Sequence, residues 1–442
     1  MRVLLVQSKS ISSGDNPVLP IGLCYIATAL ADNHHEIIMY DTNTSTNPIN
    51  DLTCLIRKSE PDIIGVGLRN IDTDINSIVP KDFVQPFSEL VSSIKEMSPK
   101  TKILAGGPGF SIFGQQLMER LPGIDYGIFN EGEETVPELL NNIDRPQSVK
   151  GLFFRGNGTI HFTGAREPVD FAKLPAPRRD FLDLGPYLEH PYSVGIQTKR
   201  GCQFGCIYCT YPLLQGVKVR MRSPQSVLDE IEELVKRYNL KSFFFVDSIF
   251  NVPQSHAREI LEGILARGID VRWEGYDELK YFDSEYYKLA KAAGCNHFEF
   301  SPDGISKSML KTLNKATSVG DIERVFSIFK KNDNVSVNFS FFMNGPGWNI
   351  ANIIRLIFFT IRCRLSLRKI ISVIHLYYIR IYPGTRIYDL SLEKGLVKPG
   401  DDMIKTTVYN PPPWKYILRM SISVFKAARN FYRVIKRTIH RS

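Results

Sequence analysis

The chain has 442 residues, of which 43% are hydrophobic and 23% are charged, a balance typical of proteins that bury a core. This length exceeds one ordinary core, so we expect two or three domains. The seven cysteines do not form the framework of a small secreted domain, and no apolar run approaches the ~20 residues of a membrane span. A reducing, cytoplasmic location is expected. The net charge of +9 is carried by residues 403–442, which hold nine lysines and arginines and no acidic residue.

Residues 1–145 alternate short β-type runs with amphipathic helical segments. The β-type runs are Val3–Val6, Ile37–Met39, Ile63–Val66, Ile103–Ala105 and Tyr126–Phe129. Helical patterns between them include Gly22–Ala31, Phe87–Met97 and Glu134–Asn142. Buried strands that alternate with helices predict an α/β domain with a Rossmann- or flavodoxin-like, doubly wound parallel sheet. Ligands of such sheets bind beyond the carboxyl ends of the strands.

Residues 146–190 form a predicted hairpin and linker. Leu152–Arg155 and Thr159–Phe162 flank the turn Gly156–Gly158, and the proline-punctuated stretch Leu174–Pro177 follows. This change in composition places the domain boundary here.

A second β/α series fills residues 191–390. Its β-type runs are Ser193–Gln197, Ser242–Val246, Val271–Trp273, His297–Phe300, Val335–Phe342 and Val373–Ile381. Helical patterns between them include Ser223–Tyr238, Gln254–Arg267, Ser284–Ala293 and Ile322–Lys331. Six such units predict a partial (β/α)6 TIM-type barrel with its chemistry at the carboxyl ends of the strands.

Residues 391–442 form a predicted C-terminal tail. After Pro411–Pro413, apolar residues recur at intervals of three to seven positions among lysines and arginines, which predicts a basic amphipathic helix. The tail has three possible roles: docking on an anionic membrane or a lipid-linked substrate, RNA binding, and capping of the barrel. The first role would make the protein peripheral at the inner membrane face. No nucleic-acid module is recognisable, so no nucleic-acid partner is expected.

Three cysteines lie close together directly after the first barrel strand. Cys202, Cys206 and Cys209 have the spacing that lets three thiolates hold one 4Fe–4S cubane, and Gly201 and Gly205 let the loop fold tightly around them. One iron then lacks a protein ligand and stays open to a cofactor or substrate, as in catalytic zinc sites. These three cysteines are therefore the candidate metal ligands and catalytic residues.

Structural zinc is the alternative for this triplet. It needs a fourth ligand nearby, and between Cys209 and Cys295 the one candidate is His256, on a predicted helix. Cys295 and Cys363 are expected to be core thiols, which leaves one cluster only.

The motif CxxxCxxC with an aromatic residue before its last cysteine, here Tyr208, resembles the signature of the radical S-adenosylmethionine (SAM) superfamily. The resemblance covers about residues 190–410 and includes the segments 220–224, 244–251, 345–347 and 380–385. It implies that SAM chelates the open iron and is cleaved reductively. The SAM-binding residues that it implies are Tyr208, Asp247, Glu299, Ser301, Gly345, Pro346, Gly347 and Arg380.

Some of these residues have ordinary structural explanations as well. Asp247 would serve equally as a helix N-cap, Gly345–Gly347 as a strand-to-helix turn, and Glu299 as a satisfied carboxylate at a strand end.

The N-terminal domain resembles the cobalamin-binding domain that precedes the barrel in one large radical SAM class. The implied cobalamin-binding residues are Leu19, Pro20, Gly22, Gly65, Arg69, Asn70, Gly106, Gly107, Pro108, Glu131, Gly132 and Glu133. Glycines at strand ends let a flat corrin approach the backbone, although any flavodoxin-like sheet needs glycine turns there. The DxHxxG motif that supplies a cobalt ligand in many cobalamin proteins is missing, and the loop reads Gln7–Ser10 instead. The lower face of cobalt is therefore expected to meet water or a non-coordinating side chain.

The resemblance implies an enzyme that cleaves SAM at a 4Fe–4S cluster and methylates an unactivated carbon of a small-molecule or lipid-like substrate through methylcobalamin. An external one-electron reductant such as flavodoxin or ferredoxin would supply the electron. The alternative is a cyclase, rearrangement or oxidation enzyme with the same cofactors, in lipid, tetrapyrrole or secondary-metabolite biosynthesis. A cobalamin sensor or carrier is a third possibility, disfavoured by the intact cysteine triplet. The methylthiotransferase layout, with a cysteine triplet in the N-terminal domain, does not fit, because that domain has only Cys24 and Cys54.

Overall fold

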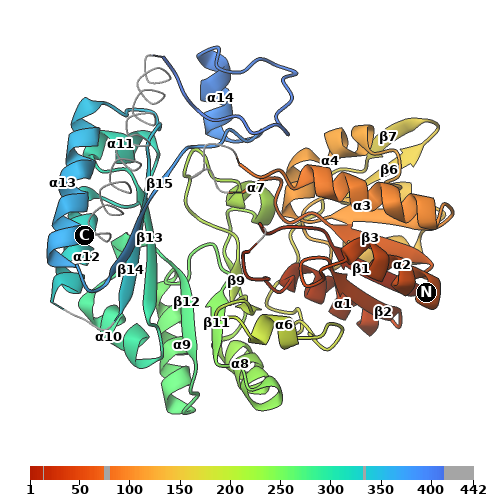
Figure 1. Ribbon diagram of the computed structural model, residues 1–442, viewed down its shortest axis with the longest axis horizontal. Coiled ribbons are helices and arrows are strands. Elements are labelled where there is room, and N and C mark those ends of the chain that lie inside the picture. The colour runs from red at the N-terminus through yellow and green to blue at the C-terminus, as the bar shows by residue number, and fades with distance from the viewer. Residues whose placement is uncertain (13, 74–79, 332–334, 413–442) are drawn as a thin grey trace, which may run out of the picture.

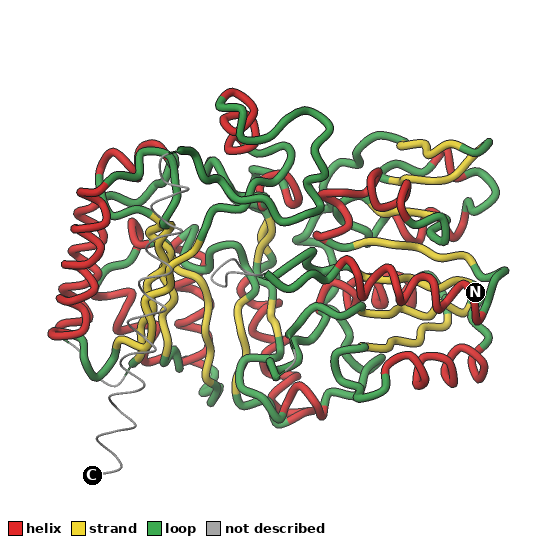
Figure 2. The backbone as a smooth tube through the Cα atoms, turned by 45° about the horizontal axis from the view of Figure 1, so that its top comes forward, coloured by secondary structure: helices red, strands yellow, loops and turns green. Residues whose placement is uncertain are grey.

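The computed structural model describes residues 1–12, 14–73, 80–331 and 335–412. Two sheets form its framework, a mostly parallel one in the N-terminal part of the chain and a parallel one in the C-terminal part (Figure 1). Figure 2 shows the strands of the two sheets as separate groups with helices around each. The predicted α/β architecture is confirmed.

The N-terminal sheet has seven strands in the order β2-β1-β3-β4-β5-β6-β7. Its first five strands are parallel: β1 (Arg2–Gln7), β2 (Glu36–Asp41), β3 (Ile63–Gly67), β4 (Lys102–Gly106) and β5 (Tyr126–Ile128). The helices between and after them are α1 (Ile21–Asp32), α2 (Pro48–Ser59), α3 (Val84–Met97), α4 (Pro108–Arg120) and α5 (Thr135–Asn141). Residues Val3–Val6 are at most 1% exposed, because helices cover both faces of a doubly wound sheet.

The hairpin of the predicted linker region belongs to this sheet. After the short 3-10 turn η1 (Pro146–Ser148), strands β6 (Leu152–Gly156) and β7 (Thr159–Phe162) extend it beyond β5 in antiparallel pairing. The Phe153 ring stacks on Phe162 at 4.5 Å between centroids. Both rings also meet Phe129, which follows β5, edge to face at 6.2 and 5.3 Å between centroids, and this packing holds the hairpin on the sheet edge.

The second sheet has six parallel strands in the order β15-β14-β13-β12-β11-β8 and stays open, as a partial barrel does. The strands are β8 (Gly195–Ile196), β11 (Ser242–Phe245), β12 (Arg272–Asp277), β13 (His297–Asp303), β14 (Ser336–Phe342) and β15 (Ile371–Tyr377). The long helices between them are α8 (Pro224–Tyr238), α9 (Gln254–Ala266), α10 (Ser284–Ala292), α12 (Val319–Lys330) and α13 (Ile350–Ser366). Shorter elements are α6 (Gly185–Leu188), β9 (Lys199–Arg200), α7 (Tyr211–Gln215), β10 (Arg220–Met221), η2 (Leu279–Tyr281), α11 (Lys307–Thr312) and α14 (Arg386–Glu393).

The last predicted strand is shorter than its apolar run suggests. β15 ends at Tyr377, whereas the run continues to Ile381. Arg380 instead forms an isolated bridge with Val408, and its guanidinium is ion paired at 2.7 Å with Asp72 of the N-terminal domain. The buried ion pair draws the chain away from the sheet.

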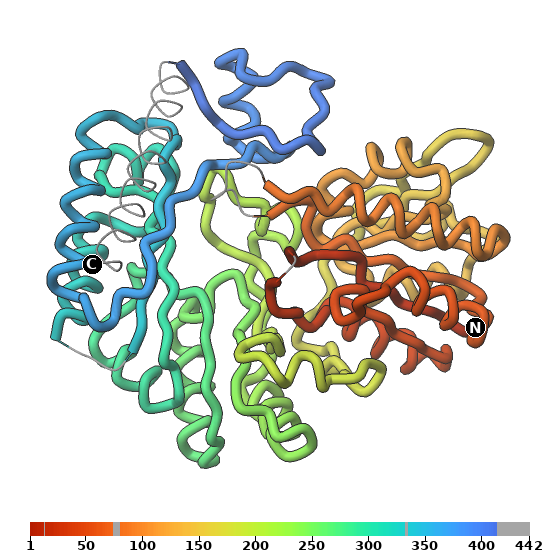
Figure 3. The backbone as a smooth tube through the Cα atoms, viewed as in Figure 1, coloured from red at the N-terminus to blue at the C-terminus, as the bar shows by residue number. Residues whose placement is uncertain are grey.

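The segment after the barrel returns to the N-terminal domain (Figure 3). Asp402 lies 2.5 Å from Arg120 of α4, and Val397, Met403 and Tyr409 are buried. The predicted basic helix of the tail falls on residues 413–442, outside the described residues. No helix in the described ranges is long and apolar enough to cross a membrane.

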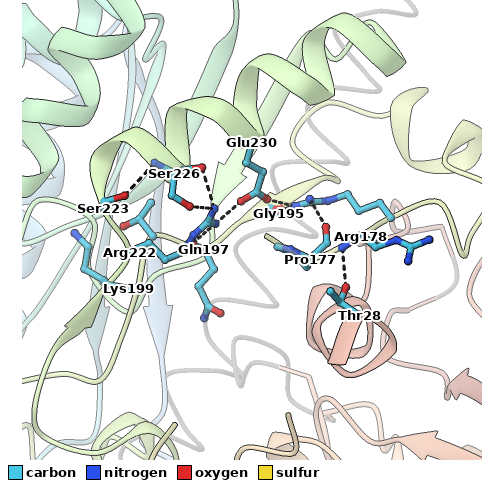
Figure 4. A network of polar contacts seen from close by, with 12 residues as sticks. Thr28, Pro177, Arg178, Gly195, Gln197, Lys199, Arg222, Ser223, Ser226 and Glu230 are labelled. Atoms are coloured by element: carbon cyan, nitrogen blue, oxygen red, sulfur yellow. Dashed lines mark hydrogen bonds and ion pairs between the residues drawn. The ribbon is translucent and has the colours of Figure 1, made fainter. Parts of the chain in front are cut away.

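The linker between the domains is anchored by a buried polar network (Figure 4). Arg179 donates to one carboxylate oxygen of Glu230 at 2.6 Å, and Arg222 donates to the other. The backbone N–H of Arg178 donates to the hydroxyl of Thr28 in α1 at 2.8 Å. Because a buried carboxylate shared by two guanidiniums is costly to disrupt, this network fixes the linker between α1 and α8.

Candidate active site

A cavity of about 1430 Å³ lies between the two domains. The carboxyl ends of β1, β3, β4 and β5 open into it from one side, and those of β12, β13 and β14 from the other. The twelve predicted cobalamin-binding residues all line it: Leu19, Pro20, Gly22, Gly65, Arg69, Asn70, Gly106, Gly107, Pro108, Glu131, Gly132 and Glu133. The structure therefore brings this set together at one wall of one cavity.

Two glycines of this wall have different structural roles. Gly107 has φ +99°, and a Cβ there would lie 2.7 Å from the carbonyl oxygen of Leu68, so its backbone packing alone excludes other residues. Gly22 has no atom within 4 Å of an added Cβ, although it lines the cavity. This open space beside Gly22 is a place where a flat ligand can approach the backbone.

The cysteine triplet lies in the loop that leaves β9. Cys202, Cys206 and Cys209 are half-buried and all three line the cavity. The loop is held by backbone hydrogen bonds from Cys202 N to Gly216 O and from Cys209 N to Cys206 O, both 3.1 Å. Gly201 begins the loop at φ +91°.

The donor set of this loop fits a cubane cluster. Among the described residues no three His, Cys, Asp or Glu side chains are grouped to hold a single metal ion. A cubane places each thiolate on a different iron, so the sulfurs need not converge on one point. Burial raises the pKa of the Cys209 thiol to about 12, and metal binding offsets this cost of forming a thiolate.

The proposed fourth ligand for zinc is engaged elsewhere. His256 is buried in α9, and its Nε2 donates to the carbonyl oxygen of Arg222 at 2.8 Å. It does not line the cavity.

Tyr208 is held in place from two sides. Its hydroxyl donates to the carboxylate of Asp303, and its ring meets Phe342 edge to face at 4.7 Å. Lys315 binds the same carboxylate at 2.8 Å. Burial and the negative charge of Asp303 raise the pKa of Tyr208, so the phenol is a neutral donor. Tyr208 thus presents a fixed aromatic ring to the cavity beside two of the cysteines.

Sequence reasoning missed Asp303 and Lys315, which also line the cavity. Asp303 has φ +63°, a conformation that Asp tolerates better than most residues. The dipeptide Asp303-Gly304 at the end of β13 was a turn signal that would have pointed to it.

The predicted SAM residues of β13 line the cavity. Glu299 accepts hydrogen bonds from Asn338 at 2.8 Å and from Ser340 at 3.2 Å. The carbonyl oxygen of Ser301 accepts from Lys315 at 2.8 Å. Both residues are therefore fixed in the cavity wall, at the end of the strand.

Asp247 lies behind the cavity wall and not in it. Its buried carboxylate accepts from the backbone N–H groups of Thr198 and Lys199 at 2.7 and 3.1 Å, and from the Thr198 hydroxyl at 2.6 Å. The Lys199 ammonium lies 3.9 Å away. Asp247 therefore positions the strand from which the cysteine loop departs.

The predicted glycine turn and Arg380 differ in their relation to the cavity. Gly345, Pro346 and Gly347 do not line it, and Asn352 donates to the carbonyl oxygen of Gly347 at 3.0 Å as the turn enters α13. Arg380 lines it, but its guanidinium is committed to Asp72. The roles of these residues toward SAM stay predictions.

The turn after β5 carries Glu131 and Glu133, the two acidic residues predicted to bind cobalamin, and its carboxylates contact the barrel domain. Glu131 is ion paired with Arg200 at 3.1 Å and with Arg220 at 2.9 Å, and Glu133 with Arg200 at 2.6 Å. Arg200 is the residue before Gly201, so these pairs tie the N-terminal sheet directly to the cysteine loop.

Comparisons with known proteins agree with this arrangement. The sequence model of the B12 binding domain matches residues 11–140, and that of the Radical SAM superfamily matches residues 196–360. The chain is 25% identical over 301 residues to an uncharacterized methyltransferase, PH0819, of Pyrococcus horikoshii, with 67% of this chain and 63% of the relative covered. It is 25% identical over 292 residues to the anaerobic magnesium-protoporphyrin IX monomethyl ester cyclase of Cereibacter sphaeroides, with 63% and 46% covered. The chain thus spans less than two thirds of either relative.

Two solved structures share the fold. The radical SAM methyltransferase TsrM of Kitasatospora setae, with tryptophan and a SAM analogue bound, has a TM-score of 0.76 and 24% identity, with 89% of this chain and 76% of TsrM covered. The cobalamin-dependent SAM radical enzyme OxsB has a TM-score of 0.74 and 18% identity, with 94% and 64% covered.

The fold and the shared cavity define a protein that joins a cobalamin-binding sheet to a radical SAM barrel. Residues 11–140 belong to the B12 binding domain family and residues 196–360 to the Radical SAM superfamily, the pair of domains of a cobalamin-dependent radical SAM enzyme, and the cofactors of these two domains are cobalamin, a 4Fe–4S cluster and SAM.

Proposed function

We propose that this protein is a methyltransferase that acts on an unactivated carbon of a small-molecule or lipid-like substrate. The main support for the proposal is the cavity between the domains, because the cysteine loop and the strand ends of the N-terminal sheet both line it. Relatives named as methyltransferases support the same reaction class. TsrM, bound to tryptophan, gives an example of a small-molecule substrate in this fold.

In this proposal the chain's own residues bind and orient the reactants. When bound, the cluster and SAM supply radical chemistry and cobalamin supplies a methyl group. Cys202, Cys206 and Cys209 hold the cluster, while the fixed ring of Tyr208 and the polar atoms at the end of β13 hold SAM. The strand ends of the N-terminal sheet hold cobalamin. The enclosing walls exclude water and keep the reacting groups in one orientation, which is where the protein contributes most to such chemistry.

Two partners complete the proposal. A one-electron reductant such as flavodoxin or ferredoxin supplies the electron, and the basic tail contacts an anionic membrane face. The support for the second is the sequence alone, since residues 413–442 carry eight lysines and arginines and no acidic residue.

A cyclase or oxidation reaction with the same cofactors is the second candidate, favoured by the relatives named as magnesium-protoporphyrin cyclases. The mass of the product separates the two. Methylation replaces one hydrogen of the substrate by a methyl group, whereas ring closure or oxidation does not.

The test begins with anaerobic reconstitution of the full chain with iron, sulfide and cobalamin. Cys202→Ala, Cys206→Ala and Cys209→Ala should each lose the charge-transfer absorption of the cluster and the reductive cleavage of SAM. Cys54→Ala is the matched control, because Cys54 is exposed and does not line the cavity. Comparison of metabolites from producing and deletion strains then identifies the methylated product. Full SAM cleavage by the three variants, or a product without an added methyl group, would contradict the proposal.

A further inference from the structure

Helix α13 has two apolar faces. Leu356, Phe359 and Cys363 are buried against the barrel sheet, where the Phe359 ring lies 5.4 Å from Phe339. The opposite face carries large apolar side chains that are 47–77% exposed: Ile350, Ile354, Ile357, Phe358, Ile361 and Leu365. At about 100° per residue these six positions fall within an arc of about 100° centred opposite the buried face. We call these six residues the α13 stripe.

The stripe stands out among the surfaces of this molecule. Sixteen large hydrophobic residues are exposed in the described part of the chain, and six of them lie in this one helix. Val373 of the adjacent strand β15 is exposed as well. By contrast, the outer surface of α8 is formed by charged residues such as Asp229 and Glu233. A continuous exposed apolar patch of this kind marks a surface that another apolar phase covers.

Cations flank the stripe on both sides. On the same helical geometry Arg355 and Arg362 lie on one flank and Arg364 on the other. Neither Arg355 nor Arg364 forms an ion pair with any residue that the structure describes. Arg362 is paired at 2.7 Å with Glu323, the acidic side chain that α12 presents here. The sequence has no acidic residue between positions 334 and 388.

We propose that α13 docks on the surface of an anionic phospholipid membrane. The stripe enters the boundary between headgroups and acyl chains, and the flanking arginines extend their guanidiniums to the lipid phosphates. With 17 residues the helix is about 25 Å long, shorter than the ~30 Å hydrocarbon core, so it lies along the surface and does not span it.

Charge decides between this partner and two other candidates. Residues 413–442 are basic without any acidic residue, so as a cover for the stripe they would bring like charge against its arginines. A second copy of the chain would bring the same arginines. Like charges at an interface oppose association. An anionic lipid surface offers apolar contact and opposite charge together.

The position of α13 is compatible with catalysis. Figure 1 shows α13 on the side of the barrel sheet that faces away from the N-terminal domain. A membrane on that side leaves the cavity between the domains unobstructed.

The test uses the full chain and flotation with two kinds of vesicle, phosphatidylcholine alone and phosphatidylcholine mixed with phosphatidylglycerol. The wild type should float with the anionic vesicles. The triple variant Ile357→Gln, Phe358→Gln, Ile361→Gln should float about tenfold less. A matched control, Ile49→Gln, Leu188→Gln, Leu265→Gln, removes three exposed apolar side chains from α2, α6 and α9 and should float like the wild type. Unfolding midpoints and iron content establish that each variant is folded.

Two further variants show whether the arginines of α13 or the C-terminal tail contribute to membrane binding. Arg355→Glu with Arg364→Glu changes exposed side chains only and should also reduce flotation. Lys426→Glu, Arg429→Glu and Arg433→Glu test the membrane contact proposed for the tail, and the part of the flotation that depends on α13 should persist in this variant. The inference is overturned if the wild type does not float, if the stripe variant floats as well as the wild type, or if only the tail variant loses binding. A wild-type dimer that the stripe variant converts to a monomer would also overturn it. SAM cleavage by the stripe variant should be unchanged, so the outcome is separate from that of the proposed reaction.

Discussion

Arg200 and Glu133 form an ion pair of 2.6 Å between the two domains, and their side chains are 7% and 5% exposed. Arg200 precedes the cysteine loop, and Glu133 follows the last parallel strand of the N-terminal sheet. Burial alone would lower the pKa of Arg200, but Glu133 and Glu131 hold it above its ordinary value. This ion pair therefore fixes the position of the cavity wall formed by the N-terminal sheet relative to the cysteine loop.

The first prediction concerns this pair. Glu133→Ala should lower the free energy of unfolding by about 3 kcal/mol, because loss of one partner leaves a buried charge less compensated. Urea unfolding of the apo-protein measures it. Glu134→Ala is the control, since Glu134 is 53% exposed and 3.4 Å from Arg166, and an exposed pair should cost less than about 1 kcal/mol. Equal losses for the two variants would show that the Arg200 pair has no special structural role.

The second prediction concerns Asp247. Asp247→Ala should reduce stability by about 3–5 kcal/mol, because it removes the acceptor for two backbone N–H groups and leaves the Lys199 ammonium buried. Iron content after reconstitution should fall as well, since the cysteine loop departs from this strand. Asp247→Asn keeps an acceptor and should retain more iron than the alanine variant. Asp270→Ala, an exposed change, serves as the control. Full iron content in Asp247→Ala would mean that Asp247 does not position the loop.

The sequence predicts the strands of both sheets because their burial leaves continuous apolar runs. Val3–Val6 and Ile63–Val66 lie inside β1 and β3. The turn at Gly156–Gly158 predicts the hairpin that β6 and β7 form, but its pairing with β5 depends on packing of Phe153 and Phe162 against Phe129 and on a sheet edge that no local pattern reveals. Long-range pairing of this kind is not encoded in periodicity.

The candidate site, too, combines features that a local motif predicts with contacts between residues far apart in the sequence. The cysteine motif is local, so its position at the cavity follows from the sequence. Glu131 and Glu133 were predicted to contact cobalamin, and their ion pairs with Arg200 and Arg220 join residues far apart in the chain. For the glycine at position 107 the sequence offers two explanations, ligand approach and a turn at the strand end, and the structure adds the close approach of the Leu68 carbonyl oxygen. Such contacts depend on how the domains meet.

The third prediction is a pH dependence. Burial raises the pKa of Asp277 to about 7, although the hydrogen bond from Tyr286 and the charge of Lys199 oppose the rise. In the unfolded chain the pKa is about 3.9, so between about pH 4 and pH 7 the folded state keeps a proton that the unfolded state releases. This group therefore makes stability fall as pH rises, by at most about 1.4 kcal/mol per pH unit in that window.

Asp277→Asn should remove this contribution. Between pH 4.5 and 7, an interval of roughly 2.5 units, the unfolding free energy should decrease less in the variant than in the wild type. The difference between the two decreases should reach up to about 3 kcal/mol. Urea unfolding of the apo-protein at the two pH values measures the difference. Glu262→Gln makes the same chemical change at an exposed site of α9. Parallel pH profiles for wild type and Asp277→Asn would show that Asp277 does not keep its proton.

The fourth prediction tests the backbone that carries the cysteine triplet. Gly201 has φ +91°, and an added Cβ would lie 2.3 Å from the carbonyl oxygen of Lys218. Gly201→Ala must therefore shift the start of the loop in addition to adopting a strained conformation. Gly268→Ala is the matched control, since Gly268 has φ +61° with no atom within 4 Å of the added Cβ.

The control should cost about 1 kcal/mol from the left-handed conformation alone. Gly201→Ala should cost more than about 2 kcal/mol, because a clash with backbone cannot be relieved by a side-chain rotation. Iron content should fall only in Gly201→Ala, since only there does the strain move the thiols relative to one another. Measurement of both quantities separates local geometry from general stability. Equal iron content in the two variants would show that the triplet holds its cluster without the close approach of Gly201 to Lys218.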